Sequence, residues 1–371
     1  LEQKRVTNPH ELYAALRRIT GETPACYTQS RSIPGDDAVP TFTRTFSGLF
    51  EERRRAEDIP GISNRREYWN AFLPTVDAGT HARHSGMLLG NISDTEVYLA
   101  IFPVSKKLIA RLPLPGHEHC GICKSHRKQL QEWDPADPTS PAPDLGCHIQ
   151  GGKAPGCSGI TAEMLRYPRS DTQHEHFVDR MKRCAVVASL FNRIIDSGDV
   201  PHVPSWTDSV ITPLLKKSVP GHRVDPTNPD DYRGIAAGNT LPKILGLVLL
   251  RRLMHWCVAT GVIPANQAGF MVDNSGEFQV FTALETLRER KRDGKDTYLL
   301  FLDLRKAYDS VPQAALWVIL RHMGIPERLV GFLEAWNAAR NYRVSVNGEL
   351  SEPFRASKGL PQGDVLSRSE E

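Results

Sequence analysis

An apolar run that ends in a carboxylate constrains the fold of this chain more than any other feature. The residues from Tyr298 to Leu302 are apolar and lead directly into Asp303, and Tyr308 and Asp309 follow in the same stretch, YLLFLDLRKAYDS. Burying an ionised carboxylate without a partner costs several kcal/mol. We therefore predict a buried strand that ends at Asp303, where a bound metal ion offsets the remaining cost. In a purely structural alternative, Asp303 only ends the strand and Asp309 caps the next helix.

The composition indicates a globular protein. The chain has 371 residues, of which 40% are hydrophobic, enough for two or three domains with a substantial core. Its formal net charge of +3 is compatible with a polyanionic partner without requiring one. Seven cysteines at irregular spacings favour an intracellular setting, nucleus or cytoplasm, over secretion. No apolar run approaches the ~20 residues that span a bilayer, so we expect no membrane span. The first residue is Leu1, which is compatible with a piece of a longer protein.

A proline-rich stretch divides the chain. Residues 132–146 (EWDPADPTSPAPDLG) contain four prolines and almost nothing to bury, so they are predicted to be a linker. Before the linker, NPHELYAALRRIT from Asn8 onward has the spacing of a helix. After it, short β-type runs alternate with helical ones over residues 151–367, which predicts an α+β or α/β domain.

Four local signals place elements in the second part of the chain. SVITPLL (209–215) is typical of a strand, and residues 239–257 of a long helix with Asn239 or Thr240 as its cap and Pro242 in its first turn. The stretch SVPQ (310–313) has the pattern of a capping box, with proline inside the first turn of a helix. The dipeptide at 347–348, Asn-Gly, predicts a β-hairpin.

Several ordered blocks resemble one known family. FLDLRKAYDSV (301–311) resembles the first catalytic motif of reverse transcriptases, particularly those of non-LTR (LINE-type) retrotransposons. The other blocks follow in that family's order: GKAPGCSGITAEMLRY (152–167), VITPLLKK (210–217), DDYRGIAAGNTLPKILGLVLLRRL (230–253), NQAGFMVDNSGEFQVFTALETLRE (266–289) and GIPERLVGFLEAWNAARNYRVSVNGELSEPFRASKGLPQGDVLS (324–367). Cys157 and Ser158 depart from the family, which usually has Pro and Asp there. Ordered blocks are far more specific than any single motif.

The resemblance implies an α+β, right-hand polymerase fold, with fingers and a partial palm. We expect an N-terminal extension, mainly helical and of uncertain fold, over residues 1–131, and the linker over 132–146. The fingers would follow over 147–296. The partial palm, with the first catalytic motif and the template-gripping motif, would occupy 297–371.

The resemblance also implies a role for individual residues in an RNA-directed DNA polymerase, a nucleotidyltransferase. Asp303 would be the catalytic, Mg²⁺-binding carboxylate, with Mn²⁺ as a substitute for Mg²⁺. Tyr308 would be the aromatic gate that excludes a ribose 2′-hydroxyl. Lys216 and Arg233 would clamp the triphosphate. Gln362 and Gly363 would support the template and the nascent base pair, so both nucleotide and template would meet Gln362.

The expected partners are an RNA template, a DNA primer and deoxynucleoside triphosphates, while the oligomeric state is left open. We expect Asp303 to lie within about 15 Å of Gln362, the scale of one small-molecule site. Lys216 and Arg233 should face the same cleft.

The polymerase site of this family also needs a Tyr-x-Asp-Asp hairpin, and no adjacent Asp pair follows Asp231. Arg368 stands where the family normally has proline. We therefore expect a fragment truncated before that motif, inactive as an isolated chain. The alternatives are a non-catalytic nucleic-acid-binding remnant and a fragment of a group II intron maturase-like polymerase.

Cysteine and histidine also cluster in HEHCGICKSH (117–126), where Cys120 and Cys123 have C-x-x-C spacing. No second pair has the spacing of a zinc finger. We therefore expect a reduced surface cluster, and a structural zinc site on Cys120 and Cys123 is the alternative.

Overall fold

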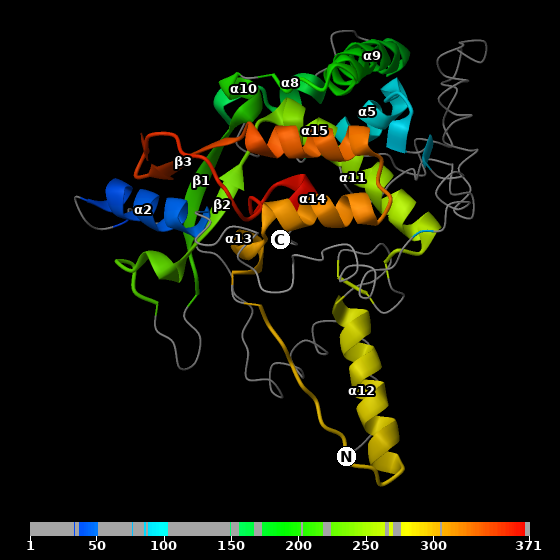
Figure 1. The fold of residues 1–371 in the computed structure, drawn as a ribbon, viewed down its shortest axis with the longest axis vertical. Coiled ribbons are helices and arrows are strands. Elements are labelled where there is room, and N and C mark those ends of the chain that lie inside the picture. Colours follow the sequence, from blue (N-terminus) through cyan, green and yellow to red (C-terminus); the bar gives the residue numbers. More distant parts are fainter. Residues whose placement is uncertain are drawn as a thin grey trace.

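The computed structural model is drawn in Figure 1. It describes residues 37–50, 88–102, 156–166, 173–201, 203–217, 224–263, 267–269, 276–304 and 306–367, with Ile33, Val76, Ser85, Gly86 and Ile149. The predicted linker at 132–146, the helix from Asn8 and the cysteines at 120 and 123 lie outside the described residues. The division into 1–131, 147–296 and 297–371 stays a prediction.

A four-stranded mixed sheet organises one side of the molecule. Its order is β2 (Tyr232–Ala237), β1 (Asp208–Leu215), β3 (Asn341–Val346) and β4 (Glu349–Leu350). β1 pairs antiparallel with β2 and parallel with β3, and β3 pairs antiparallel with β4. The predicted strand at 209–215 is therefore confirmed. The sheet and the surrounding helices agree with a mixed α/β class.

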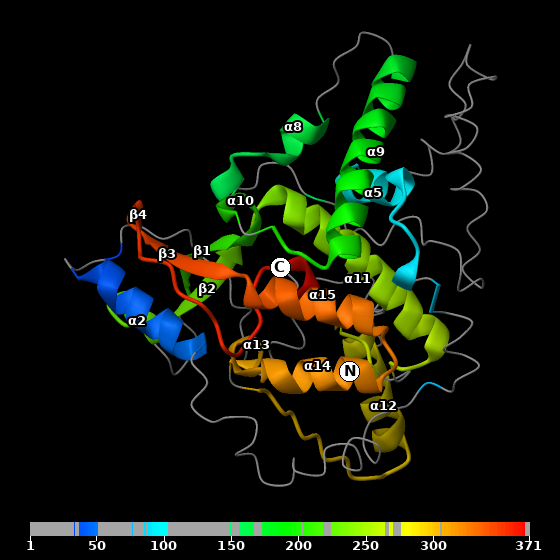
Figure 2. The same cartoon turned by 45° about the horizontal axis from the view of Figure 1, so that its top comes forward.

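Helix α2 (Ala38–Phe50) covers one face of this sheet (Figures 1 and 2). Phe42 meets Tyr232 edge-on, with ring centroids 4.9 Å apart. Alternate residues of β3, Tyr342 and Val344 among them, are buried in the same cluster. The period of two places these side chains on the face toward α2 and their neighbours on the opposite face.

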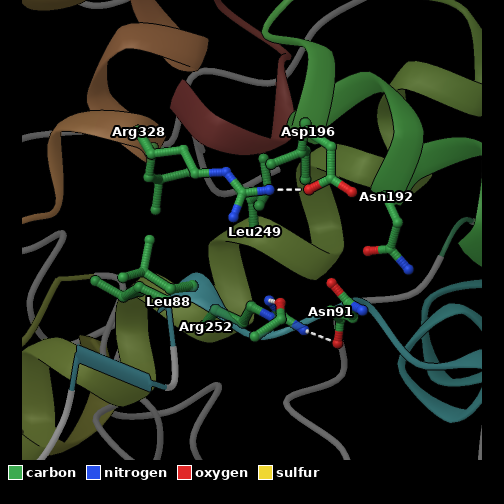
Figure 3. A pocket seen from close by; sticks show the side chains of 11 residues that line it. Leu88, Asn91, Asn192, Asp196, Leu249, Arg252 and Arg328 are labelled. Atoms are coloured by element: carbon green, nitrogen blue, oxygen red, sulfur yellow. Dashed lines mark hydrogen bonds and ion pairs between the residues drawn. The ribbon is translucent and has the colours of Figure 1, made fainter.

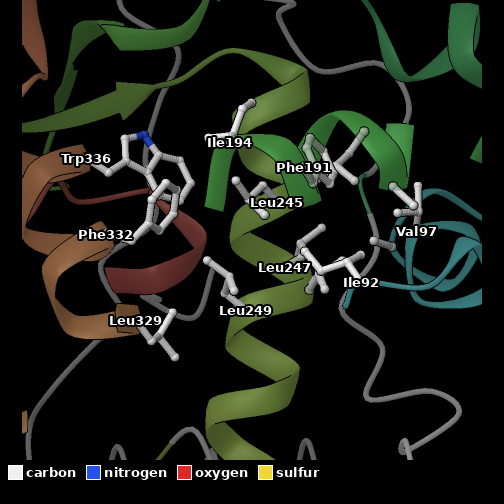
Figure 4. Close-up of a cluster of buried hydrophobic side chains, with 14 of the residues drawn as sticks. Ile92, Val97, Phe191, Ile194, Leu245, Leu247, Leu249, Leu329, Phe332 and Trp336 are labelled. Carbon is white, nitrogen blue, oxygen red and sulfur yellow. The ribbon is translucent and has the colours of Figure 1, made fainter. Parts of the chain in front are cut away.

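Helix α11 (Thr240–Thr260) is the centre of the larger core (Figure 4). Its buried run from Ile244 to Leu249 is apolar on every side, as expected of a helix covered all round. Around it pack α5 (Asp94–Ile101), α9 (Gln173–Ser197) and α15 (Glu327–Ala338). The helix ends at Gly261, whose left-handed conformation (φ +67°) lets its N–H bond the last carbonyls.

The start of α11 only partly matches the expectation. Asn239 is the N-cap residue and Pro242 lies in the first turn, as predicted. The Asn239 side chain, however, makes no capping bond. Its Oδ1 accepts a hydrogen bond from the Ser158 N–H (2.8 Å), and its Nδ2 donates to the Asp208 carbonyl (3.0 Å). The amide thus joins the block at 156–158 to the start of β1.

The predicted strand leading into Asp303 is absent. Residues 295–304 have no regular secondary structure and form an extended connection beside α12 (Gly276–Arg292), which projects from the body (Figure 1). Phe301 and Leu302 are 78% and 85% exposed. A run of consecutive apolar residues suits a central strand, buried on both faces. None of the described strands pairs with this segment, so that environment does not form.

The helix start predicted at 310–313 is also wrong in detail. Ser310 ends the one-turn helix α13 (Ala307–Ser310), and α14 (Gln313–His322) has Pro312 as its N-cap, with no side-chain cap. The Gln313 amide instead donates to the Gly359 carbonyl (2.9 Å), a tertiary bond that replaces the local one.

The hairpin predicted at Asn347-Gly348 is confirmed. Both residues have positive φ (53° and 87°), as a two-residue turn between twisted strands requires. Its strands extend the sheet that contains β1, so the last part of the chain and the predicted fingers strands share one sheet.

Short elements complete the described part: η3 (Gly156–Ser158), α8 (Ala162–Arg166), α10 (Pro204–Thr207), η4 (Pro229–Asp231) and η5 (Val365–Ser367). None of the helices in the described ranges has the length and apolarity needed to cross a bilayer.

Candidate polymerase site

A loop of five residues, Gly359 to Gly363, joins the segments predicted to form the site. At one end the Leu360 N–H donates to the Tyr308 carbonyl (2.8 Å), and the Gly359 N–H to the Val311 carbonyl (2.7 Å). At the other end the Gln362 carbonyl accepts from the Ala236 N–H on β2 (2.7 Å). We call this segment the 359–363 loop. It ties α13 to the outer edge of the sheet.

The two glycines of the loop are needed where they stand. Gly359 (φ +78°) and Gly363 (φ +102°) have backbone conformations that L side chains rarely adopt. A Cβ on Gly359 would lie 2.9 Å from the Asp309 carbonyl oxygen. One on Gly363 would lie 3.0 Å from the Ala236 carbonyl oxygen. The close approach of the loop to both neighbours therefore depends on glycine.

The basic residues predicted to bind a triphosphate share one face of the β1–β2 hairpin. Tyr232 points toward α2, so the next residue, Arg233, points to the opposite face. Lys216 directly follows β1 and donates its backbone N–H to the Asp231 carbonyl (2.9 Å), which by the same alternation places it on the face of Arg233. Ile235 is also on this face and touches the position of Gly363. The hairpin's basic face thus borders the 359–363 loop.

A second lysine, which the sequence analysis did not single out, lies beside Lys216. Lys216 Nζ donates to the Asp230 carbonyl (2.6 Å), and Lys306 Nζ lies 2.9 Å from Asp230 Oδ1. Lys306 has positive φ (50°), which is uncommon for a non-glycine residue and directs it back toward η4. Two ammonium groups from distant segments therefore meet one residue.

Burial shapes the electrostatics of α13. It raises the pKa of Asp309 above its ordinary value, an effect that Lys306 and Lys358 oppose. Burial also raises the pKa of Tyr308 above its ordinary value. Asp309 is half-buried and belongs to the same motif as Asp303, but it faces two lysines, a setting that suits a structural carboxylate.

Asp303 stands apart from these contacts, in the exposed segment before α13. Within the described ranges, no group of three or more Asp, Glu, His or Cys side chains is placed to hold a metal ion. Mg²⁺ sheds its water reluctantly and relies on several oxygen ligands, which a single exposed carboxylate does not supply. The donor set in this part of the chain therefore does not fit the metal by itself.

The structure therefore brings together most of the predicted residues. Tyr308, Gln362 and Gly363 meet through the 359–363 loop, and the hairpin that carries Lys216 and Arg233 borders it. The approach of Asp303 to Gln362 stays a prediction. Sequence reasoning missed Lys306 and a buried pair, Arg340 and Asp364, described below, because no local pattern marks them.

A shallow pocket elsewhere is no second candidate (Figure 3). It has an interior of about 10 Å³, room for about one water, and its charged side chains are already paired. Arg328 pairs with Asp196, and Arg252 with Glu96 (2.6 Å) and the Asn91 carbonyl (2.9 Å). The first bond joins α15 to α9, and the other two join α11 to α5 and to the residues before it.

Comparison with known proteins shows what the second part of the chain is similar to. The family described as Reverse transcriptase (RNA-dependent DNA polymerase) matches residues 215–369. Over 220 residues the chain is 27% identical to the Retrovirus-related Pol polyprotein from type-2 retrotransposable element R2DM of Drosophila melanogaster, covering 58% of this chain and 18% of that protein. It is 25% identical over 228 residues to the type-1 retrotransposable element R2 polyprotein of Popillia japonica, covering 60% and 28%. With the Probable RNA-directed DNA polymerase from transposon X-element of Drosophila melanogaster it shares 24% over 180 residues, 48% and 19% of the two chains.

These matches confirm the resemblance to reverse transcriptases of non-LTR retrotransposons, which covers residues 215–369 in the family match. The chain spans less than a third of the length of these relatives. The matched segment contains the 359–363 loop, α13, Lys216 and all of β2 with Arg233, but only the last residue of β1.

Proposed function

We propose that this chain is the fingers and partial palm of a retroelement RNA-directed DNA polymerase, which binds an RNA template, a DNA primer and deoxynucleoside triphosphates. The observation that carries the proposal is the meeting of Tyr308, the 359–363 loop and the basic hairpin face within the segment that matches the family. Each comes from a different part of the chain, and a nucleotide on a paired template needs all of them.

In this proposal each group acts through its own chemistry. Lys216 and Arg233 bind the triphosphate oxygens, with charge-assisted hydrogen bonds from ammonium and guanidinium groups. Tyr308 limits the space beside the sugar, and Gln362 and Gly363 contact the template. For two-metal nucleotidyl transfer to a primer 3′-hydroxyl, Asp303 would have to be joined by metal ligands from outside the described residues, because those described here do not form a metal site around it.

A second candidate is nucleic-acid binding without catalysis. The observation that favours it is the absence of a three-ligand metal group among the described residues. Both candidates predict primer–template binding, and they differ in whether this chain also recognises a nucleotide.

Binding measurements on the 371-residue chain test the proposal. A fluorescent DNA primer on an RNA template is titrated with the chain, and then dATP or ATP is added to the complex. We expect saturable primer–template binding, preferential binding of dATP, and loss of that preference in Tyr308→Ala. A chain that binds primer–template but neither nucleotide would support the second candidate, and one that binds no primer–template would overturn both.

A further inference from the structure

A buried ion pair holds the segment that follows the 359–363 loop. Arg340 NH1 lies 2.5 Å from Asp364 Oδ2, and the two side chains are only 9% and 19% exposed. Arg340 directly precedes β3, and Asp364 directly follows Gly363. The pair therefore connects the junction between α15 and β3 to the end of the loop.

Both partners are fixed on their other sides as well. The Arg340 guanidinium lies 5.3 Å from the ring centre of Trp336, on the last turn of α15. Asp364 Oδ1 accepts a hydrogen bond from the Leu366 N–H (2.8 Å) and so caps η5. Val365, in η5, presses on α11, since a Cβ on Gly246 would lie 2.5 Å from its Cγ2. The Asp364 carboxylate thus fixes the end of the 359–363 loop and caps η5, which packs against α11.

A buried ion pair is a poor way to gain stability. Replacing such a pair by apolar side chains of similar size is often neutral, because desolvation offsets the attraction. A guanidinium fork, by contrast, fixes the direction of its partner closely. We therefore expect this pair to fix the position of the backbone around Asp364 more than it stabilises the fold.

The side chain whose position this ion pair can influence is that of Gln362, two residues before Asp364. The Gln362 carbonyl accepts a hydrogen bond from β2, which fixes its backbone, and none of the described residues hydrogen-bonds its partly buried amide side chain. The amide is thus available to a ligand. The direction of the amide depends on the backbone before and after Gln362. Asp364 fixes the backbone on the C-terminal side.

We propose that Arg340 is a positioning residue that orients the Gln362 amide toward the template by anchoring Asp364. This inference rests on the proposed function for the identity of the ligand. The orientation of the loop itself can be measured without any ligand.

The first experiment measures amide hydrogen exchange in the unliganded chain. In Arg340→Met and in the isosteric Asp364→Asn, which keeps an oxygen to cap η5, we expect the amide of Ala236 to exchange at least about threefold faster than in the wild type. Arg343→Met is the matched control, because Arg343 lies on β3 only three residues after Arg340 but contacts Asp208 and Ser351. An Ala236 amide as protected in both variants as in the control would overturn the proposal.

The second experiment is a double-mutant cycle on primer–template affinity. Gln362→Ala should weaken binding about three- to tenfold, the range of one hydrogen bond. Arg340→Met should weaken it by a similar factor, but have almost no further effect when Gln362 is already Ala. A purely structural role would give additive effects, which would overturn the proposal, and rescue by Arg340→Lys would support it.

The two experiments separate the failures. If the wild-type chain binds no primer–template, the proposed function fails, and the exchange of Ala236 still decides the anchoring role. If the chain binds but the cycle is additive, the proposed function stands and the positioning role fails.

Discussion

The ammonium group of Lys306 lies 2.9 Å from Oδ1 of Asp230. Asp230 belongs to the predicted fingers, and Lys306 to the first catalytic motif. Lys216 donates to the backbone carbonyl of the same aspartate. The carboxylate thus occupies the neighbourhood of two cations that a triphosphate would also attract.

Replacing Asp230 by Asn should strengthen nucleotide binding. The substitution removes a competing anion and leaves the backbone carbonyl that Lys216 uses. We expect dATP to bind about two- to fivefold more tightly, in keeping with an exposed ion pair of up to ~1 kcal/mol. Nucleotide titration at low and high salt measures the effect, which should shrink with salt. Asp293→Asn, at the exposed Lys295–Asp293 pair after α12, is the control, and an equal gain there would contradict the specific role of Asp230.

Arg233→Ala should weaken nucleotide binding by at least ~1.5 to 3 kcal/mol, the range for a hydrogen bond to a charged group. Arg233 faces the side of the hairpin that borders Gly363, where its guanidinium can reach phosphate oxygens. Titration of dATP on the primer–template complex gives the affinity. Arg288→Ala, on exposed α12, should leave it unchanged, and an unaltered affinity in Arg233→Ala would remove that residue from the site.

The stability of the chain should depend on pH through Asp309. Because burial raises its pKa above the ordinary 3.8, the folded state holds the proton more tightly than the unfolded state. The free energy of unfolding therefore falls as pH rises from below 3.8 through the folded pKa, and the loss is complete above it. Urea unfolding from pH 3 to 7 should show this fall in the wild type and a smaller one in Asp309→Asn. Lys358→Met removes a cation that favours the carboxylate and should enlarge the fall, and identical curves for all three proteins would contradict the argument.

Local signals predicted what local forces determine. The strand β1, the helix α11 and the turn at Asn347-Gly348 each formed where β-branched residues, caps or a positive-φ dipeptide indicated. The prediction of a strand before Asp303 was wrong. A strand is stable only when it pairs with neighbouring strands, and a short stretch of sequence does not show which strands those are. Ser310 does not form the predicted capping box, because the Gln313 side chain donates its hydrogen bond to the Gly359 carbonyl instead.

The site shows the same division. The glycines and the glutamine of the 359–363 loop could be predicted, because neighbouring residues in the sequence form a recognisable motif. The partners that fix them could not. Arg340 and Asp364, like Lys306 and Asp230, are pairs whose members are ordinary charged residues in their own stretches of sequence, and only the packing of distant elements brings them together.

The exposed apolar segment should make the chain associate with itself. Leu300 and Leu302 are 84% and 85% exposed within a run of apolar residues that pairs with none of the described strands. Contiguous exposed apolar surface and unpaired backbone both favour association. Sedimentation at tens of micromolar should show larger species for the wild type than for Leu300→Lys/Leu302→Lys. Because these side chains are exposed, the double variant should keep its thermal stability, and equal sedimentation would contradict the prediction.

The last prediction is that the 371-residue chain does not extend a primer. Among the described residues, Asp303 is an exposed carboxylate without two further ligands around it, and Mg²⁺ leans on several oxygens at once. A second metal position, which would steady the leaving oxygen while the first activates the primer hydroxyl, needs still more of them. The assay supplies an RNA template, a labelled DNA primer, Mg²⁺ and all four deoxynucleotides, with Mn²⁺ in a parallel reaction. We expect no extended primer in either, while primer–template binding persists. A product that disappears in Asp303→Ala would contradict this, and would mean that other carboxylates, or a second copy of the chain, complete the metal site around Asp303.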